Sequence, residues 1–234
     1  MDKIEQIYEG KAKKLFTTKD PDLVIQEFKD DATAFDATKR GTIASKGIVN
    51  NKLSAVIFTF LEKEGIPTHF EKLLNDRDML VKKVQIIPLE VTMRNVVAGG
   101  MAKLLGLEEG IVLKRPVLEW HFKEDKLHDP LINDDHALSL GIATEEELAT
   151  IRKYSFKVND LMKEFFLAKG LMLVDFKLEF GRFKGKVILA DEMSPDTCRL
   201  WDSKTKEKLD KDRFRRDLGN VEEAYQEVLR RVTA

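Results

Sequence analysis

The chain has 234 residues, of which 43% are hydrophobic and 35% charged, and its 40 basic and 41 acidic residues give a formal net charge of −1. Disordered proteins carry fewer apolar residues and more net charge, so this is the composition of a folded globular protein. The balanced charge excludes a strong overall attraction to nucleic acids or anionic lipids, and no apolar stretch is long enough to span a bilayer.

The single cysteine, Cys198, excludes an intrachain disulfide and a zinc site rich in thiolates. We also expect no signal peptide, because the first residues include Asp2, Lys3 and Glu5 and form no apolar stretch. These features favour a reducing compartment, and we predict a cytoplasmic protein.

The first part of the chain predicts β-strands. Residues 4–8 and 12–16 flank a turn at Glu9-Gly10, and residues 23–28 form a third apolar run. Residues 30–46 mix Asp, Thr, Lys and Gly without periodicity, so we expect a loop there. Loops of this length are uncommon in compact domains unless they have a function.

A helix is predicted from a cap at Ser45 to about Glu64, because apolar residues recur on one face and Gly65 and Pro67 follow. The next segment predicts strands. Residues 79–87 form one, and residues 89–95 form another, in which apolar and polar side chains alternate.

A short helix is expected over residues 101–105, followed by a polar loop over residues 121–135 that contains His128-Asp129-Pro130. A capping box over residues 144–147 then starts a helix of about 24 residues, which ends at Lys169-Gly170.

The remaining chain predicts a hairpin, with strands over residues 171–180 and 186–192, and a final helix over residues 221–232. This order of elements predicts an α+β fold with mainly antiparallel sheets and packed helices. We expect a smaller lobe over residues 1–87 and a larger lobe over residues 88–234.

Acidic side chains gather on one face of the predicted hairpin. Asp175, Lys177 and Glu179 alternate with apolar residues, so they point the same way along the strand. Asp191 joins them if the connecting loop has three or five residues, whereas an even loop would turn it to the apolar face. Oxygen ligands without His or Cys suit Mg²⁺, which binds one or two carboxylates together with substrate phosphates. The alternative is a solvated face with an internal lysine–carboxylate bridge.

Basic residues elsewhere suit phosphate groups. Gly10 allows a close backbone approach at a turn, and Lys11 and Lys13 project from one face of the strand after it. Each of Arg94, Arg199 and the basic tail can bind a phosphate or carboxylate, although each alone is better explained as a surface residue. No Walker A loop is present, so a nucleotide site here requires a hairpin that covers the phosphates.

Other catalytic classes lack support in the sequence. The four histidines show no paired metal-binding spacing, and we expect His69, His121 and His136 to be surface or satisfied polar residues. No nucleophile elbow is present, and Cys198 has no histidine near it in sequence.

The motifs together resemble the phosphoribosylaminoimidazole-succinocarboxamide synthase (SAICAR synthetase) family. The most specific are the strand motif at 173–181, Ser194-Pro195-Asp196 and Arg199-Leu200-Trp201-Asp202. Further matching stretches, in the family's order, are residues 8–13, 47–52, 65–68, 80–83, 94–95, 128–130, 191–192 and 210–215.

The resemblance implies a two-lobed fold with a nucleotide cleft similar to those of ATP-grasp enzymes and protein kinases. It implies an ATP-dependent ligase that joins L-aspartate to the carboxylate of carboxyaminoimidazole ribonucleotide (CAIR), giving SAICAR, ADP and phosphate in de novo purine biosynthesis. It also implies Mg²⁺ as cofactor and a homo-oligomer, with a dimer favoured, and it implies neither a nucleic-acid nor a membrane partner.

The family's roles are carried over to matching positions. Gly10, Lys11, Ala12 and Lys13 would line the nucleotide phosphates, the backbone at Val81 and Lys82 would meet adenine, and Glu179 and Asp191 would hold Mg²⁺ beside Lys177. Arg94, Asp175, Arg199, Lys211 and Arg215 would hold the ribonucleotide, together with Gly100, where many members carry Ser. Asp36, Asp129 or a phosphate oxygen would take the proton of the aspartate amine, and the sequence does not choose among them.

Two alternatives use the same residues. An ATP-dependent small-molecule kinase would transfer phosphate to a hydroxyl without aspartate. A non-enzymatic nucleic-acid-binding protein would use the basic tail, but the neutral net charge and the scarcity of aromatic residues near those arginines disfavour it.

Overall fold

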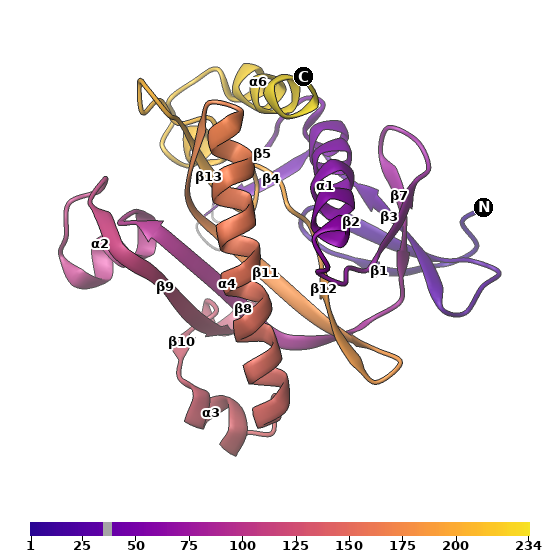
Figure 1. The fold of residues 1–234 in the computed structure, drawn as a ribbon. Coiled ribbons are helices and arrows are strands. Elements are labelled where there is room, and N and C mark those ends of the chain that lie inside the picture. Colours follow the sequence, from indigo (N-terminus) through magenta and orange to yellow (C-terminus); the bar gives the residue numbers. More distant parts are fainter. Residues whose placement is uncertain (35–38) are drawn as a thin grey trace.

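The computed structural model describes residues 1–34 and 39–234, so Asp36 lies outside the described residues. The N-terminal part forms an antiparallel five-stranded sheet (Figure 1). Its strands, in spatial order, are β1 (Gln6–Glu9), β2 (Lys13–Thr17), β3 (Leu23–Phe28), β7 (Asp78–Lys82) and β6 (Phe70–Leu73).

The second sheet contains the later strands, and all of its pairs are antiparallel. Its path runs through β10 (Leu131–Ile132), β9 (Val112–Phe122), β8 (Gln85–Val96), β11 (Leu171–Phe183) and β12 (Lys186–Ala190), and β13 (Cys198–Asp202) also pairs with β11. Mixed helices and antiparallel sheets confirm the predicted α+β class.

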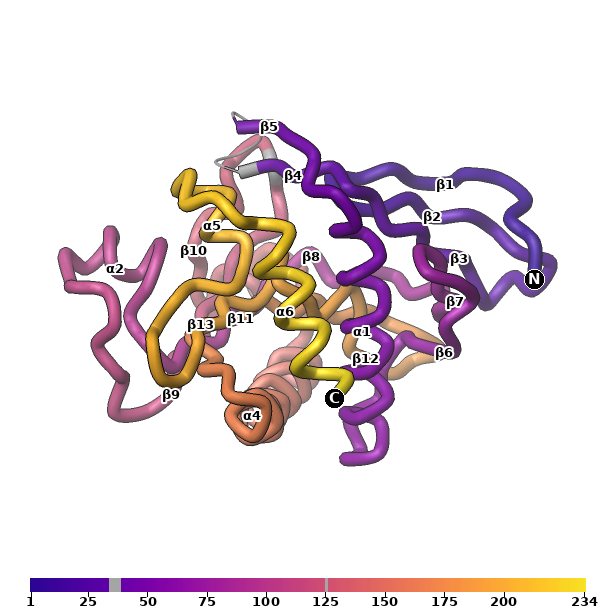
Figure 2. Tube along the Cα trace, turned by 90° about the horizontal axis from the view of Figure 1, so that it is seen from above, coloured from indigo at the N-terminus to yellow at the C-terminus, as the bar shows by residue number. Residues whose placement is uncertain are grey.

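Helices cover these sheets. The long helix α4 (Glu145–Ala168) packs on β11, and α6 (Val221–Thr233) packs on α1 (Lys46–Lys63) (Figures 1 and 2). The shorter helical segments are α2 (Gly99–Leu105), η1 (Asp125–Leu127), α3 (Asp134–Ser139) and α5 (Asp212–Arg215). None of the helices in the described part of the chain is both long and apolar enough to cross a membrane.

One prediction near α1 was wrong and another was only partly right. The expected loop over residues 30–46 contains the antiparallel strand pair β4 (Asp31–Ala34) and β5 (Lys39–Thr42). Ser45 is the N-cap residue of α1 as expected, but it adopts a left-handed conformation with φ 61° and its side chain makes no cap hydrogen bond. Asp30 provides the side-chain acceptor at the start of α1 instead, because its Oδ1 accepts the N–H of Gly47 at 2.8 Å.

The expected strand break at Pro88 was also wrong. The chain leaves the first sheet after Lys82, and β8 runs through Pro88. The register between β8 and β11 shifts where Pro88 lies, between the pairs Glu179↔Glu90 and Gly181↔Ile86. Proline is tolerated in a strand at such an irregularity because it has no N–H to donate. The division into lobes of residues 1–87 and 88–234 stays a prediction.

The later elements agree with the predictions more closely. Thr144 accepts the N–H of Glu147, and the Glu147 carboxylate accepts the N–H of Thr144, which is the expected capping box of α4. The expected loop over residues 121–135 was only partly right, since β9 extends to Phe122 and β10 lies within it.

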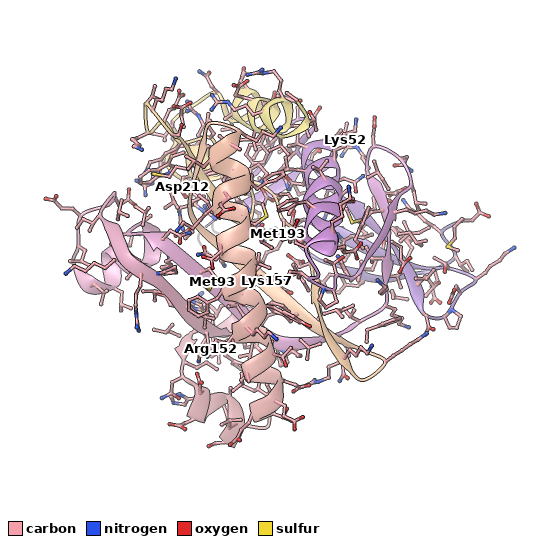
Figure 3. The ribbon with its side chains drawn as sticks, viewed as in Figure 1. Lys52, Met93, Arg152, Lys157, Met193 and Asp212 are labelled. Atoms are coloured by element: carbon pink, nitrogen blue, oxygen red, sulfur yellow. The ribbon has the colours of Figure 1, made fainter. Side chains whose placement is uncertain are left out.

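Strand β11 alternates between core and cleft as expected over Phe176–Phe180, whereas the register shifts between Leu173 and Asp175, and Asp175 is buried and does not line the cleft. Val174, Phe176, Leu178 and Phe180 are all buried, with exposures of 1% or less. The main hydrophobic core includes residues of both sheets and of the helices, and Met93 and Met193 lie within it, whereas Lys52 lies at the surface (Figure 3). One continuous core therefore holds the sheets on either side of the candidate site.

Candidate active site

A cavity of about 1480 Å³ is lined by residues of both sheets and of the C-terminal segment. We call it the cleft. It brings together most of the residues that the sequence singled out, although they come from distant parts of the chain. They are Gly10, Lys11, Ala12, Lys13, Val81, Lys82, Asp129, Lys177, Glu179, Asp191, Lys211 and Arg215.

The turn between β1 and β2 brings Lys13 into the cleft. The N–H of Gly10 bonds to the carbonyl of Lys13 at 2.8 Å, and a Cβ on Gly10 would lie 2.6 Å from the Tyr8 hydroxyl. Lys13 forms ion pairs with Asp191 and, at 3.3 Å, with Glu192. Burial alone would lower the pKa of Lys13, but these carboxylates outweigh it and hold that pKa above its ordinary value.

Asp191 reaches the cleft by an unexpected route. The hairpin between β11 and β12 has a two-residue turn at Lys184-Gly185, and Glu179 pairs with Ala190. An even turn was expected to point Asp191 into the apolar face. Strand β12 ends at Ala190, however, and Asp191 takes a left-handed conformation with φ 65°, which breaks the alternation of the strand and lets its carboxylate meet Lys13.

Glu179 and Asp191 lie close enough to affect each other's ionisation. Burial, reinforced by the charge of Asp191, raises the pKa of Glu179 to about 7, although Lys123 opposes the shift. Burial would also raise the pKa of Asp191, but the charge of Lys13 outweighs it and the pKa is lowered. Two half-buried carboxylates thus share the cleft, with lysines as their counter-charges.

Sequence reasoning missed the partners of two predicted residues. Lys123 pairs with Glu179, and Glu90 pairs with Lys177. Lys123 follows the end of β9, and a lone lysine after a strand carries no recognisable signal. Glu90 lies opposite Glu179 in the register of β8 and β11, which no local pattern reveals.

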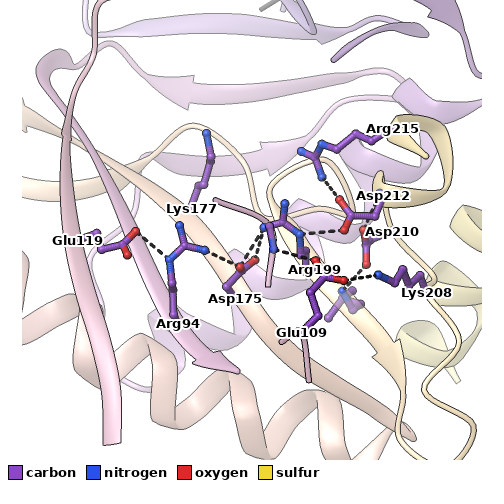
Figure 4. A network of polar contacts seen from close by, with 12 residues as sticks. Arg94, Glu109, Glu119, Asp175, Lys177, Arg199, Lys208, Asp210, Asp212 and Arg215 are labelled. Carbon is purple, nitrogen blue, oxygen red and sulfur yellow. Dashed lines mark hydrogen bonds and ion pairs between the residues drawn. The ribbon is translucent and has the colours of Figure 1, made fainter. Parts of the chain in front are cut away.

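Arg94, Gly100, Asp175 and Arg199 lie outside the described lining of the cleft. A chain of charged contacts connects Arg94, Asp175 and Arg199 to the cleft (Figure 4). Asp175 accepts hydrogen bonds from Arg94 at 2.8 Å and from Arg199 at 2.9 Å and 3.0 Å.

The same chain continues to the edge of the cleft. Arg199 Nε donates to Asp212 at 3.0 Å, and Arg215 Nη1 donates to the other oxygen of Asp212 at 2.7 Å (Figure 4). At the other end, Arg94 Nε donates to Glu119 at 2.8 Å. Asp175 therefore orients two guanidinium groups, and Asp212 orients a third that lines the cleft.

Gly100 lies in the first turn of α2 beside Arg94. A Cβ added to Gly100 would lie 3.7 Å from Arg94 Nη2, which is an ordinary contact distance. A serine would therefore fit at this position, and the glycine does not reflect a lack of space.

The expectation that His69 is a surface or satisfied polar residue was wrong. His69 is 3% exposed, lines the cleft, and has no hydrogen-bond partner for Nε2 within the described residues. Burial, followed by the charge of Lys13, lowers its pKa to about 3, so the imidazole is neutral at physiological pH. Cys198 is buried, and burial raises the pKa of its thiol to about 12.

Comparisons with known proteins give one consistent result. The sequence profile of the SAICAR synthetase family matches residues 6–232. The phosphoribosylaminoimidazole-succinocarboxamide synthases of Clostridium acetobutylicum and Clostridium kluyveri are 60% and 61% identical over 233 residues, covering 100% of this chain and 99% of each relative.

Solved structures give the same result. The phosphoribosylaminoimidazole-succinocarboxamide synthase of Ehrlichia chaffeensis is 48% identical with a TM-score of 0.97, covering 98% of this chain and 99% of that one. A SAICAR synthetase solved in complex with ADP is 51% identical with a TM-score of 0.94, covering 97% of each chain.

Proposed function

Since the chain belongs to the SAICAR synthetase family, we infer that it is an ATP-dependent ligase of purine biosynthesis. It joins L-aspartate to the carboxylate of CAIR and forms SAICAR, ADP and phosphate. The observation that carries this conclusion is the full-length match to enzymes of this name. A solved structure similar to this chain, a SAICAR synthetase in complex with ADP, supports it. The family match does not favour the kinase alternative.

We propose that the turn between β1 and β2 covers the nucleotide phosphates. Gly10, Lys11, Ala12 and Lys13 would line the phosphates, and the backbone at Val81 and Lys82 would meet adenine. All of these residues line the cleft, and Lys13 is a half-buried ammonium that is paired with carboxylates. Phosphate oxygens are also suitable partners for such a point charge.

Glu179 and Asp191 fit a magnesium ion. The described residues contain no group of three or more His, Cys, Asp or Glu that is arranged to hold a metal by itself. Mg²⁺ does not need such a group, because it usually binds one or two protein carboxylates and takes its remaining ligands from phosphates and water. When bound, it would neutralise charge on the phosphoryl group. Burial, together with the charge of Asp191, raises the pKa of Glu179, and a divalent cation would relieve the repulsion between the two carboxylates.

The remaining predicted residues are proposed to hold the ribonucleotide and to move protons. Arg94, Arg199, Lys211 and Arg215 would bind its anionic groups beside Gly100, with Asp175 orienting the first two. Lys177 would lie by the phosphates. Asp129 would accept the proton of the aspartate amine, and its carboxylate is oriented by the N–H of Glu124 at 2.9 Å.

This arrangement suits activation of a carboxylate. A carboxylate is a poor electrophile at neutral pH, and phosphoryl transfer from ATP converts it into an acyl phosphate that an amine attacks. Phosphoryl transfer depends on positioning and charge neutralisation rather than on a protein nucleophile. The cleft offers cationic side chains, and the carboxylates proposed to hold Mg²⁺, for this purpose.

One assay tests the ligase. Purified protein with Mg-ATP, CAIR and aspartate should release ADP steadily, and omission of aspartate should stop turnover. ADP release at an equal rate without aspartate would contradict the ligase and favour a kinase. Mass spectrometry of the product distinguishes SAICAR, which the ligase forms, from a phosphorylated hydroxyl compound, which a kinase would form.

We further propose a cytoplasmic homodimer. Helix α2 lies at one edge of the molecule (Figure 1). The helix and the residues after it expose the large apolar side chains of Leu104, Leu105, Leu107, Ile111 and Val112. Exposed apolar patches of this kind mark interaction surfaces. Leu104→Glu should shift the mass measured by light scattering from dimer to monomer, and a wild-type monomer at micromolar concentration would contradict the proposal.

A further inference from the structure

A buried cluster of charged and polar side chains surrounds Asp196, which lines the cleft. Its other members come from three separate parts of the chain: Lys46 of α1, Lys211 before α5, and Tyr225 of α6. Lys46 Nζ lies 2.8 Å from Asp196 Oδ2, and the Tyr225 hydroxyl donates to Asp196 Oδ1 at 2.6 Å. We call these four residues the Asp196 cluster.

The cluster is unusual because of its burial. The Lys46 side chain is 0% exposed, that of Asp196 is 4% exposed, and Tyr225 is 1% exposed. Lysine is almost never fully buried unless it is paired, and a buried ion pair is weak evidence for added stability. The position of the cluster next to the cleft therefore points to a role in the site.

Lys211 is the member of the cluster that makes no hydrogen bond to Asp196. Its Nζ lies 3.6 Å from Asp196 Oδ2, which is too long for a hydrogen bond, and this is its only ion pair within the described residues. Lys46 and Tyr225 already occupy the two oxygens of Asp196 at shorter distances. Lys211 is thus held near a carboxylate that is bound to other groups.

The charges around Lys211 favour a further anion. Burial lowers the pKa of Lys211, Asp196 opposes this shift, and Arg215 and Lys46 add to the lowering. Two ammonium groups share one Asp196 carboxylate, whereas Arg215, which lines the same cleft, has Asp212 as its partner. An incoming phosphate or carboxylate would give Lys211 a partner of its own.

The backbone around the cluster is tied independently of these side chains. The N–H of Lys211 bonds to the carbonyl of Pro195 at 3.1 Å, and the N–H of Asp196 bonds to Ser194 Oγ at 3.1 Å. Ser194 in turn donates to Glu192 at 2.8 Å. Loss of the Tyr225 hydroxyl would therefore leave the backbone at Asp196 and Lys211 in place and change only how the side chains pair.

We propose that Tyr225 and Lys46 are positioning residues that occupy both oxygens of Asp196 and thereby keep the Lys211 ammonium available to an anionic group of the ribonucleotide. This inference rests on the proposed function, in which Lys211 binds that substrate. Without the Tyr225 hydroxyl, Asp196 Oδ1 loses its donor. Lys211 is the nearby cation that lacks a hydrogen bond to Asp196, and a charge-assisted bond between them would neutralise it.

Tyr225→Phe tests the proposal because it removes one hydroxyl and no packing volume. The KM for CAIR should rise about tenfold, which is the size of effect expected from a hydrogen bond to a charged group. The KM for ATP and the melting temperature should remain close to wild type. Tyr154→Phe is the matched control, since Tyr154 lies in α4 and outside the described lining of the cleft, and it should leave both constants unchanged.

A double-mutant cycle separates this inference from the role of Lys211 itself. Lys211→Ala should raise the KM for CAIR, and adding Tyr225→Phe should then have no further effect. If Tyr225→Phe weakens CAIR binding equally in both backgrounds, Tyr225 does not act through Lys211 and the inference is overturned. If Lys211→Ala alone leaves the KM unchanged while ADP release still requires aspartate, the assigned role of Lys211 fails and the ligase stands.

A crystal structure of Tyr225→Phe provides a readout that does not depend on activity. Lys211 Nζ should move to within hydrogen-bond distance of an Asp196 oxygen. An unchanged separation from Asp196, with a normal KM for CAIR, would overturn the proposal.

Discussion

Glu179 and Asp191 are each paired with a lysine in the cleft. Lys123 neutralises Glu179 and Lys13 neutralises Asp191, so both acids have a cationic partner in the absence of ligand. Buried carboxylates without partners would be costly, and these lysines reduce that cost. The magnesium ion proposed to bind here would have to compete with these ammonium groups, which would then be free to contact phosphate.

Substitution of either acid should impair catalysis more than folding. Glu179→Gln and Asp191→Asn keep the side-chain shape but remove a charge from the proposed metal site. We expect turnover to fall by about 10² or more, similar to the loss of a key electrostatic contact in a transition state. Steady-state ADP release measures this. Near-normal rates in both variants would remove these residues from the metal site.

Binding of the magnesium nucleotide should depend on pH. The pKa of Glu179 is raised to about 7, so below that pH the carboxyl group holds a proton that the metal must displace. Affinity for Mg-ADP should therefore rise with pH up to about 7, by no more than about tenfold per unit for one proton, and then level off. Calorimetric titration at a series of pH values measures this dependence.

Glu179→Gln is the control for the pH experiment, because the amide does not titrate in this range. Its weaker affinity should be nearly independent of pH. A slope that persists in Glu179→Gln would assign the proton to another group in the cleft.

At the scale of elements, α4 illustrates local determination. Its capping box joins Thr144 and Glu147 through two reciprocal hydrogen bonds of 3.2 Å and 2.9 Å. Each satisfies a backbone N–H that would otherwise lack a partner at the helix start. The helix packs on β11, which carries Glu179 at the cleft, so the cap supports the scaffold of the site without touching it.

Thr144→Ala should reduce stability without reducing activity. Loss of an N-cap oxygen costs about 1 kcal/mol, and Thr144 is not among the described residues that line the cleft. Urea denaturation should show a decrease of that size in the free energy of unfolding, with kcat unchanged. Thr144→Ser retains the oxygen and should stay close to wild type; an equal loss in both variants would indicate that the lost methyl group matters instead.

At the scale of the whole molecule, one hydrophobic core extends across both sheets. It contains Val24 and Val81 of the first sheet together with Val91 and Phe176 of the second, and Leu53 of α1 lies in it at 0% exposure. Strands of both sheets line the cleft, so the same core that stabilises the fold also sets the distance between the proposed nucleotide and metal groups.

Leu53→Ala should therefore destabilise both sheets together. Truncation of a buried leucine costs about 2–5 kcal/mol. Both tryptophans lie in the second sheet, Trp120 in β9 and Trp201 in β13, so their fluorescence should report an earlier unfolding midpoint. Lys52→Ala changes a neighbouring surface residue and should have little effect. An unchanged tryptophan midpoint in Leu53→Ala would mean that the two predicted lobes unfold separately.

Patterns among neighbouring residues were sufficient to predict the elements that depend on local rules. The capping box fixed the start of α4, and the alternation along β11 identified Lys177 and Glu179 as one face with the core on the other, although the buried Asp175 does not share their place in the cleft. These two predictions succeeded because each depends on side chains only a few positions apart. Twelve of the predicted site residues also line the cleft, but many of the other residues that line it were not singled out.

Only the tertiary structure decided which groups meet in the site. Asp191 enters the cleft through a left-handed residue after an even turn, although strand parity alone would have excluded it. The pairs of Lys123 with Glu179 and Lys46 with Asp196 join segments 56 and 150 positions apart. Electrostatic partners at such separations depend on how whole sheets and helices pack, and no periodicity in the sequence encodes that distance.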